Sequence, residues 1–178
     1  MFYSSTYDSP LGKITLCSDG ENLCGLWFDG QKHYGKTIPE AMTPDDTAEP
    51  FPLAKQWLDD YFVGRQPGID RLPLKPLGTD FRQRVWRILT EIPYGQVTTY
   101  GAIAKTIAEE TKANAAAQAV GGAVGHNPLS IIIPCHRVVG ADGSLTGYAG
   151  GLSRKITLLE IEGVDMSGLS VPTKGTAL

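Results

Sequence analysis

The sequence predicts two domains: a small α/β domain in the N-terminal half and a mainly helical domain with a helix-turn-helix in the C-terminal half. Three observations support this. A hairpin pattern lies near the N-terminus, a proline-rich break lies near residue 70, and helical apolar spacing dominates the rest. A chain of 178 residues is long enough to bury a core in one domain or in two small ones.

The hairpin is predicted from two short apolar runs, Leu11–Cys17 and Leu23–Phe28. The polar stretch between them contains Asp19-Gly20, a dipeptide typical of tight turns between antiparallel strands. Cys17 and Cys24 fall within the runs, so we expect both to be core residues. The chain has three cysteines, an odd and sparse set that does not resemble a disulfide framework.

The region that follows the hairpin is less regular. Residues 37–52 contain four prolines and four acidic residues, and this composition predicts an irregular segment. Apolar residues from Leu53 to Phe62 then recur at helical spacing, and Gly64 marks the end of that helix. Prolines between residues 67 and 76, followed by Gly78, predict a linker. The first domain is therefore expected to span residues 1–78.

The C-terminal half opens with Thr79-Asp80, which are good first residues for a helix, and the helical pattern runs to Ile92. A short helix is predicted from Tyr100 to Ile107. The polar residues 109–112 are expected to form a turn, followed by a second helix at roughly residues 113–125. Two short helices joined by a tight polar turn predict a helix-turn-helix.

The segment after this motif ends in a chemically reactive pair. Residues 131–133 predict a buried strand, which would place Cys135 and His136 just beyond its end. A glycine-rich loop follows at residues 140–151, and a last helix is expected to end at Glu162-Gly163. We expect the second domain to span residues 79–166, with a frayed tail at residues 167–178.

Two glycines inside the helix predicted at residues 113–125 need an explanation, because each costs about 1 kcal/mol relative to alanine. Gly121 and Gly122 would be favoured if another surface approached the helix closely. Close packing against a neighbouring helix and contact with a nucleic-acid groove explain them equally well at this point.

The charge distribution favours the C-terminal half as the half that would meet phosphates. The net charge is −3, yet residues 1–79 carry seven Lys and Arg against eleven Asp and Glu, whereas residues 80–170 carry eight of each. The chain has no block of five like charges, and this disfavours a protein that binds nucleic acid by charge alone. No signal peptide and no run long enough to span a membrane are visible, so we expect a cytoplasmic protein.

Cys135 and His136 are candidates for nucleophilic chemistry. A thiol with a pKa near 8.5 is only slightly ionised at neutral pH, and histidine is the usual base that raises the thiolate fraction. Adjacent residues of an extended segment point to opposite faces, so contact between them would need a bend or a bridging water. A buried structural cysteine beside a surface histidine is an equally good interpretation of these two residues alone.

The run Ile133-Pro134-Cys135-His136-Arg137-Val138-Val139, preceded by Asn127, resembles the active-site signature of the O6-alkylguanine-DNA alkyltransferases. The similarity extends along the second half and reaches short segments of the first. The similar segments are Asp8–Gly12, Leu26–Phe28, Ile92–Gly95, Val97–Tyr100, Ala119–Ala123 and Tyr148–Leu152.

This resemblance implies an N-terminal domain like ribonuclease H and a C-terminal domain whose helix-turn-helix places its second helix in the minor groove. Gln118, Ala119, Gly121 and Gly122 would then contact DNA, and the damaged guanine would be flipped out of the stack into a pocket. The family commonly has an arginine where Gln118 stands, so this chain departs from the pattern at the residue that would fill the vacated stack.

The resemblance also implies a role for each polar residue at the site. Cys135 would attack the alkyl carbon as a thiolate, with His136 as its base through water and Glu162 orienting the imidazole. Asn127 would tie the helix-turn-helix to the active-site loop, and Tyr100 would donate to the departing guanine. The pocket would be lined by Tyr148 and the backbone of Ala149.

The implied activity is a single transfer from O6-alkylguanine, and from O4-alkylthymine, in double-stranded DNA to Cys135, because the thioether product is inert. No cofactor and no metal are expected, and the protein is expected to act as a monomer. Three alternatives remain at this stage: a cysteine hydrolase, a DNA-binding module that senses lesions without removing them, and a transcription factor. Relatives that only sense lesions lack the cysteine, which disfavours the second.

Overall fold

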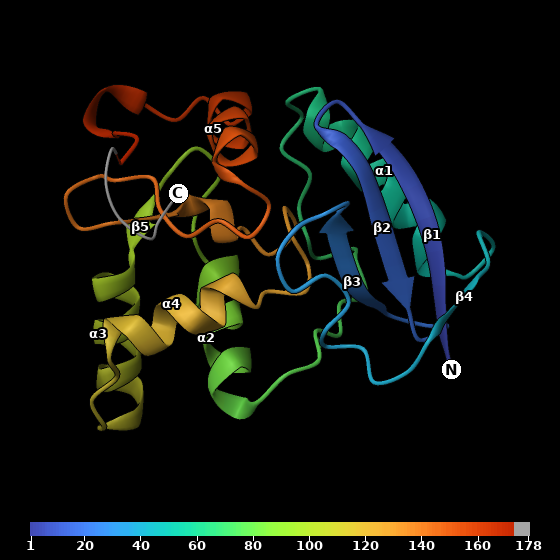
Figure 1. Ribbon diagram of the computed structural model, residues 1–178, viewed down its shortest axis with the longest axis horizontal. Coiled ribbons are helices and arrows are strands. Elements are labelled where there is room, and N and C mark those ends of the chain that lie inside the picture. Colours follow the sequence, from blue (N-terminus) through green and yellow to red (C-terminus); the bar gives the residue numbers. More distant parts are fainter. Residues whose placement is uncertain (173–178) are drawn as a thin grey trace. The chain divides into compact units, whose positions relative to one another are not determined.

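The computed structural model describes residues 1–172, and the chain divides into two compact units (Figure 1). The first unit contains Met1–Gly78 together with Pro128–Ile132, and the second contains Thr79–Asn127 and, of the described chain, residues 133–172. The sequence-based division placed residues 128–132 in the second domain. They join the first because Leu129 forms a parallel bridge with Leu26.

The first unit is a four-stranded sheet with one helix. Its elements are β1 (Phe2–Ser9), β2 (Gly12–Ser18), β3 (Leu23–Phe28), β4 (Met42–Pro44) and α1 (Pro50–Phe62). The strand order is β3-β2-β1-β4, with β4 parallel to β1 and the other pairs antiparallel. The predicted hairpin of β2 and β3 and the predicted helix α1 are both confirmed.

The sequence pattern did not reveal β1 or β4. The strand β1 is rich in serine, threonine and tyrosine and lacks an apolar run. It nevertheless pairs with β2 along nearly its full length, from Tyr3 opposite Ser18 to Ser9 opposite Gly12. The strand β4 lies within the segment expected to be irregular, and α1 begins at Pro50 inside the same segment. Pairing with neighbouring strands, which no local pattern encodes, fixes these short elements.

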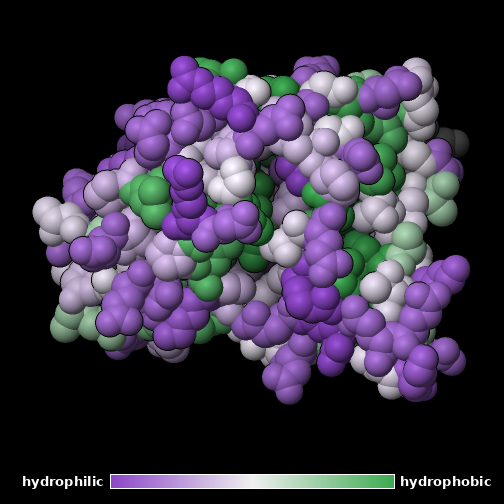
Figure 2. All heavy atoms as spheres, turned by 180° about the vertical axis from the view of Figure 1, so that it is seen from behind, coloured by the Kyte–Doolittle hydropathy of each residue, from purple (hydrophilic) through white to green (hydrophobic). Residues whose placement is uncertain are grey.

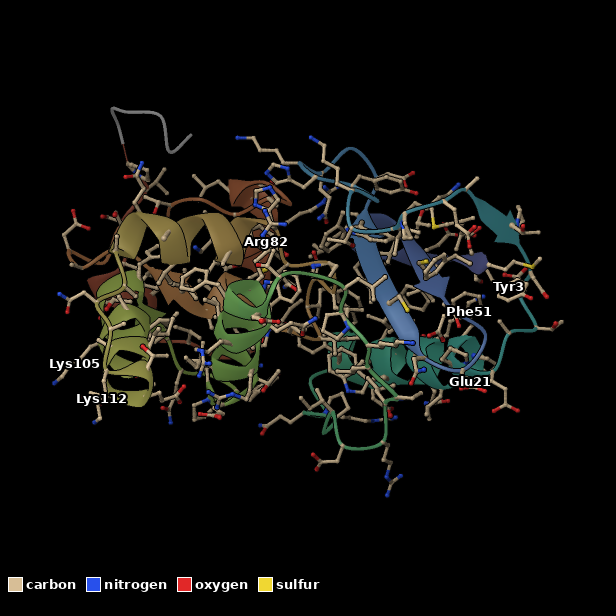
Figure 3. All side chains as sticks on the ribbon, turned by 90° about the horizontal axis from the view of Figure 1, so that it is seen from below. Tyr3, Glu21, Phe51, Arg82, Lys105 and Lys112 are labelled. Carbon is tan, nitrogen blue, oxygen red and sulfur yellow. The ribbon has the colours of Figure 1, made fainter. Side chains whose placement is uncertain are left out.

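The core of the first unit forms between the sheet and α1, which contacts β1, β2 and β3. Phe51 on the first turn of α1 is fully buried and lies against the sheet (Figure 3). Cys17 and Cys24 pack with Trp27 in a buried cluster, and both thiols are free, which confirms them as core residues. Their sulfur atoms therefore contribute to packing rather than to a site.

The strand predicted at residues 131–133 is wrong. Residues 128–130 lie beside β3, where Leu26 donates to Pro128 (2.8 Å) and Ser130 donates to Leu26 (3.0 Å). The chain then turns sharply, because Ile131 has a φ of +71° and the Ile132 amide donates back to Ser130. A β-branched residue in the left-handed region is strained, so the surrounding packing must hold it there.

The second unit is mainly helical. Its elements are α2 (Asp80–Thr90), β5 (Thr98–Thr99), α3 (Tyr100–Thr111), α4 (Ala117–Gly125), the 3₁₀ turn η1 (Cys135–Arg137), β6 (Val138–Val139), α5 (Leu152–Ile161) and the 3₁₀ turn η2 (Met166–Gly168). The threonine before α2 and the threonine before α3 cap these helices with their side chains. In Figure 1, α4 lies between α2 and α3 and contacts both.

The boundaries of α3 and α4 differ from those predicted. The acidic residues expected in a turn belong to the last turn of α3, where Glu110 accepts hydrogen bonds from Arg87 on α2 (2.8 Å). Glutamate is also a good helix former, and the helix ends only at Thr111, before Lys112, which has a φ of +57°. The connection to α4 therefore lies later in the sequence than expected, at residues 112–116, and α4 starts at Ala117.

The chain beyond α5 is more ordered than expected, at least to the limit of residue 172. Residues 166–168 form η2, and Ser170 pairs with the glycine-rich loop, accepting from Leu145 (2.8 Å) and donating to Gly143 (3.0 Å). The tail prediction is thus wrong for residues 167–170, and residues 173–178 lie outside the described part.

Polar side chains cover most of the face shown in Figure 2. None of the helices within residues 1–172 is long and apolar enough to cross a membrane.

Candidate active site

Cys135 opens the 3₁₀ turn η1 and is buried. Its amide donates to the Ile133 carbonyl (2.8 Å), which also accepts the side-chain amide of Asn127 (2.7 Å). The Asn127 side chain additionally hydrogen-bonds the cysteine sulfur. One residue, two positions beyond the end of α4, therefore fixes both the backbone that leads into the turn and the thiol itself.

His136 is fully buried and is oriented by Glu162 at the end of α5. Its Nε2 lies 2.6 Å from Glu162 Oε1. The same carboxylate accepts two hydrogen bonds from Arg137, from Nε (2.8 Å) and from Nη2 (3.0 Å), and a longer one from the Gly95 amide (3.3 Å). Arg137 is held in turn by the Ile92 carbonyl (2.6 Å).

The surroundings of Glu162 and His136 determine the protonation state of each. Burial alone would raise the pKa of Glu162, but the hydrogen bonds and charges of His136 and Arg137 lower that pKa to about 2. Burial lowers the pKa of His136, and the positive charges of Arg137 and Lys155 lower it further against the pull of Glu162. The imidazole is therefore neutral, with its Nε2 hydrogen donated to the carboxylate and Nδ1 left as the acceptor.

The thiol of Cys135 is protonated at rest. Burial raises its pKa, which the hydrogen bond from Asn127, the charge of Lys155 and the nearby backbone amides only partly oppose. Such a thiol needs a base or added positive charge to become a nucleophile. The neighbouring imidazole has the protonation state that a base requires.

Two buried polar atoms of this site have no hydrogen-bond partner within the described residues: His136 Nδ1 and the Tyr148 hydroxyl oxygen. Buried polar groups in native proteins are nearly always paired, so unpaired ones point to contacts made during function. Within residues 1–172, no group of three or more His, Cys, Asp or Glu side chains is arranged to hold a metal ion.

Two tyrosines lie near Cys135: Tyr148 in the glycine-rich loop and Tyr100 at the start of α3. The Tyr100 hydroxyl donates to the Thr146 carbonyl (3.1 Å). Burial, and in smaller part the nearby Cys135, raise the pKa of both Tyr100 and Tyr148. Gly147 has a φ of +71°, and a Cβ there would lie 3.0 Å from the Tyr100 hydroxyl. Glycine at this position therefore permits both the turn and the close approach of the phenol. Ala149 follows Tyr148 in the same loop and is half-buried.

The predicted DNA-contacting residues share one side of α4. Gln118, Ala119 and Gly122 are exposed and Gly121 is half-buried, whereas Val120, Ala123 and Val124 face the core. A Cβ on Gly122 would meet nothing within 4 Å, and one on Gly121 would make only ordinary contact with the Tyr100 ring. Packing within the unit therefore requires glycine at neither position. At Gly122 no neighbouring helix lies close enough, so the explanation by close helix packing is wrong for this residue.

The structure thus brings together six of the residues that the sequence singled out, and Gly121 of α4 lies beside one of them, Tyr100. The six are Tyr100, Asn127, Cys135, His136, Tyr148 and Glu162. Two further members, Arg137 and Lys155, were missed. Arg137 lies within the recognised signature, and Lys155 occupies the apolar face of the predicted last helix, three residues before Leu158. A charged residue on such a face was the available signal.

Comparison with known proteins gives a consistent result for both halves of the chain. Residues 2–76 match the ribonuclease-like domain of 6-O-methylguanine DNA methyltransferase, and residues 80–164 match the DNA-binding domain of the same protein. A methylated-DNA–protein-cysteine methyltransferase of Mycobacterium tuberculosis is 46% identical over 162 residues, covering 91% of this chain and 93% of the relative. One from Haemophilus influenzae is 41% identical over 160 residues, covering 90% and 86%.

Solved structures agree with these matches. A crystal structure of the O6-methylguanine methyltransferase of M. tuberculosis has a TM-score of 0.77 at 46% identity and covers 91% of this chain and 93% of its own. A second, of the M. tuberculosis protein in complex with DNA, has a TM-score of 0.78 and covers 90% and 92%. Since the matches span both units and the relatives are of similar length, this chain belongs to the 6-O-methylguanine DNA methyltransferase family.

Proposed function

We propose that this protein repairs DNA by moving the alkyl group of O6-alkylguanine, and of O4-alkylthymine, onto Cys135 in a single irreversible step. The observation that carries the proposal is the arrangement around Cys135: a buried thiol lies next to a neutral imidazole that is held by an ionised carboxylate, with Nδ1 unpaired. The family to which the chain belongs supports the substrate, since its curated relatives are methylated-DNA–protein-cysteine methyltransferases.

In the proposed reaction the thiol proton passes to His136 Nδ1 through a bridging water, and Glu162 stabilises the imidazolium that forms. The sulfur then attacks the alkyl carbon, a C–S bond forms, and the C–O6 bond breaks with its electron pair remaining on guanine. The Tyr100 hydroxyl donates to the departing base as that charge develops. Because a thioether is not hydrolysed under mild conditions, each molecule acts once.

Asn127, Tyr148 and Ala149 complete the site in this proposal. Asn127 is bonded to the Ile133 carbonyl and to the sulfur, so it couples the end of α4 to the position of the nucleophile. The buried Tyr148 hydroxyl has no partner in the described chain and is available to a flipped base. The backbone of Ala149 would contact the leaving oxygen beside it.

We further propose that α3 and α4 form a helix-turn-helix in which α4 enters the minor groove. Gln118, Ala119, Gly121 and Gly122 would contact the DNA. The small size of the alanine and the two glycines suits a narrow groove. The absence of a packing need for Gly122 supports this role. Lys112, directly after α3, extends away from the helix (Figure 3) and would contact phosphates. The protein would act as a monomer on DNA in the cytoplasm, where Cys135 stays reduced.

Mass spectrometry of the intact protein after incubation with duplex DNA containing O6-methylguanine tests the proposal. We expect a gain of one methyl group, located on the peptide that contains Cys135, and the loss of that gain in Cys135→Ser. A methyl group found on another residue, or repair without any gain in protein mass, would refute the mechanism. A cysteine hydrolase would instead turn over repeatedly and leave the protein unmodified.

A further inference from the structure

Lys155 is a buried charge that the proposed reaction does not yet use. Its side chain is fully buried on α5, between Leu152 and Leu158 along the helix, on the face that carries the core leucines. A buried ammonium group is costly unless it is well hydrogen-bonded or paired with an opposite charge. Its position therefore calls for a physical explanation.

The hydrogen bonds of Lys155 join two segments of the active site. Its Nζ donates to the Val138 carbonyl (2.5 Å) and to the Thr146 carbonyl (2.9 Å). Val138 follows the turn that Cys135 opens, and its own amide donates back to the Cys135 carbonyl. Thr146 also accepts the hydroxyl of Tyr100, the donor proposed for the departing base. When that hydroxyl turns to the substrate, the carbonyl keeps the lysine as a partner.

We propose that Lys155 is a positioning residue for the alkyl transfer: its ammonium group ties the Cys135 turn to the glycine-rich loop and supplies a buried positive charge that favours the Cys135 thiolate. The inference rests on the proposed function, since it concerns the nucleophile of that reaction. It adds a second source of activation to the base that the histidine provides.

Lys155 and Cys135 influence each other's pKa, as the proposal requires. Lys155 lowers the pKa of Cys135 against the effect of burial, and Cys135 raises the pKa of Lys155, which burial holds at about 8. At neutral pH the amine is therefore mostly charged. Other titratable groups face this pair from the surrounding elements. They are Tyr100 on α3, His136 and Arg137 on η1, Tyr148 in the loop, Arg154 on α5 and Glu162 directly after α5.

The charge of Lys155 can be separated from its hydrogen bonds by substitution. Lys155→Gln keeps a donor but removes the charge, whereas Lys155→Arg keeps the charge and the donors. Lys105→Met is a matched control, because it removes one lysine charge at an exposed position on α3. The readout is the pH dependence of iodoacetamide labelling of the Cys135 peptide, followed by mass spectrometry, which reports the thiolate without any DNA.

We expect Lys155→Gln to move the midpoint of labelling upward by about 1 pH unit or more, with about tenfold slower labelling at pH 7. Lys155→Arg and Lys105→Met should label with midpoints near that of the wild type. The transfer rate on O6-methylguanine DNA should show the same displacement in pH. A folded Lys155→Gln protein with an unchanged labelling midpoint would overturn the inference, even if its transfer rate had fallen.

A reciprocal measurement covers the case in which the Gln variant does not fold. NMR titration of the lysine side chains in wild type and in Cys135→Ser should show a lower pKa for Lys155 when the Cys135 thiol is lost, because coupling between two titrating groups is mutual. An identical Lys155 pKa in the two proteins would overturn the inference. Labelling uses no DNA, so a protein that shows these shifts but transfers no methyl group would refute the proposed function alone.

Discussion

The carboxylate of Glu162 is expected to stabilise the fold as well as orient the histidine, and Glu162→Gln measures how much. The side chain has no exposed surface, and its pKa is about 2 against an ordinary value of 4.5. A difference of this size corresponds to about 3 kcal/mol of folding free energy at pH 7. Removing the charge also leaves Arg137, which is only 11% exposed, without its anionic partner.

The pH dependence follows from the sign of this shift. Because the pKa is lowered in the folded state, the contribution of Glu162 is complete above its ordinary value and is lost as the pH falls from about 4.5 to about 2. The wild type should lose about 2 kcal/mol of this contribution between pH 7 and pH 3. The Gln variant has no carboxyl group at this position, so it cannot lose that contribution.

Urea unfolding of the wild type and of Glu162→Gln, at pH 7 and at pH 3, is the assay. The variant should be about 3 kcal/mol less stable at pH 7, and the gap should narrow to about 1 kcal/mol at pH 3. Glu160→Gln, an exposed position two residues earlier, serves as the control and should change stability by only a few tenths. A gap that is equal at both pH values would show that packing, rather than ionisation, makes Glu162 stabilising.

Three further predictions concern the reaction. The methyl groups transferred should reach a plateau at about one per protein molecule, and Cys135→Ser should abolish transfer while keeping DNA binding; more than one equivalent repaired would contradict this. His136→Ala and Glu162→Gln should each slow transfer. The increase in activation free energy in the double variant should be much smaller than the sum of the two single increases, whereas additive increases would mean independent roles. Gln118→Arg should accelerate transfer from duplex DNA but leave the reaction with free O6-benzylguanine nearly unchanged, because only the duplex substrate needs base flipping. Equal acceleration of both reactions would mean that residue 118 acts on the chemistry in the pocket.

The sequence was sufficient for those elements that have strong local signals. The hairpin of β2 and β3 follows from two apolar runs and an Asp-Gly turn, and the helix α1 follows from its apolar spacing. The strand β1 could not be predicted in this way, because its stability comes from pairing with β2 and not from its own composition. The isoleucine run at residues 131–133 misled for the opposite reason, since its apolar side chains are buried in a turn and not in a strand.

The candidate site was predicted to a similar extent. Cys135, His136 and Glu162 were identified through the resemblance, and their geometry explains why the imidazole is neutral. Sequence reasoning expected Cys135 in an extended segment, but it opens a 3₁₀ turn. The contribution of Arg137 to the same carboxylate depends on three-dimensional contacts that no spacing along the chain encodes. Lys155 was overlooked because its partners are backbone carbonyls from two distant segments.

The assignment of residues 128–132 to the first unit has a consequence for exchanging parts between relatives. The chain passes from one unit to the other three times, after Gly78, after Asn127 and after Ile132, so no single cut point separates two complete modules. A chimera joined only at residue 78 would combine β3 from one parent with the strand-like segment at Leu129 from the other. A hybrid that inherits residues 128–132 from the same parent as residues 1–78 keeps that pairing native, and it is the recombinant we expect to fold with parental stability.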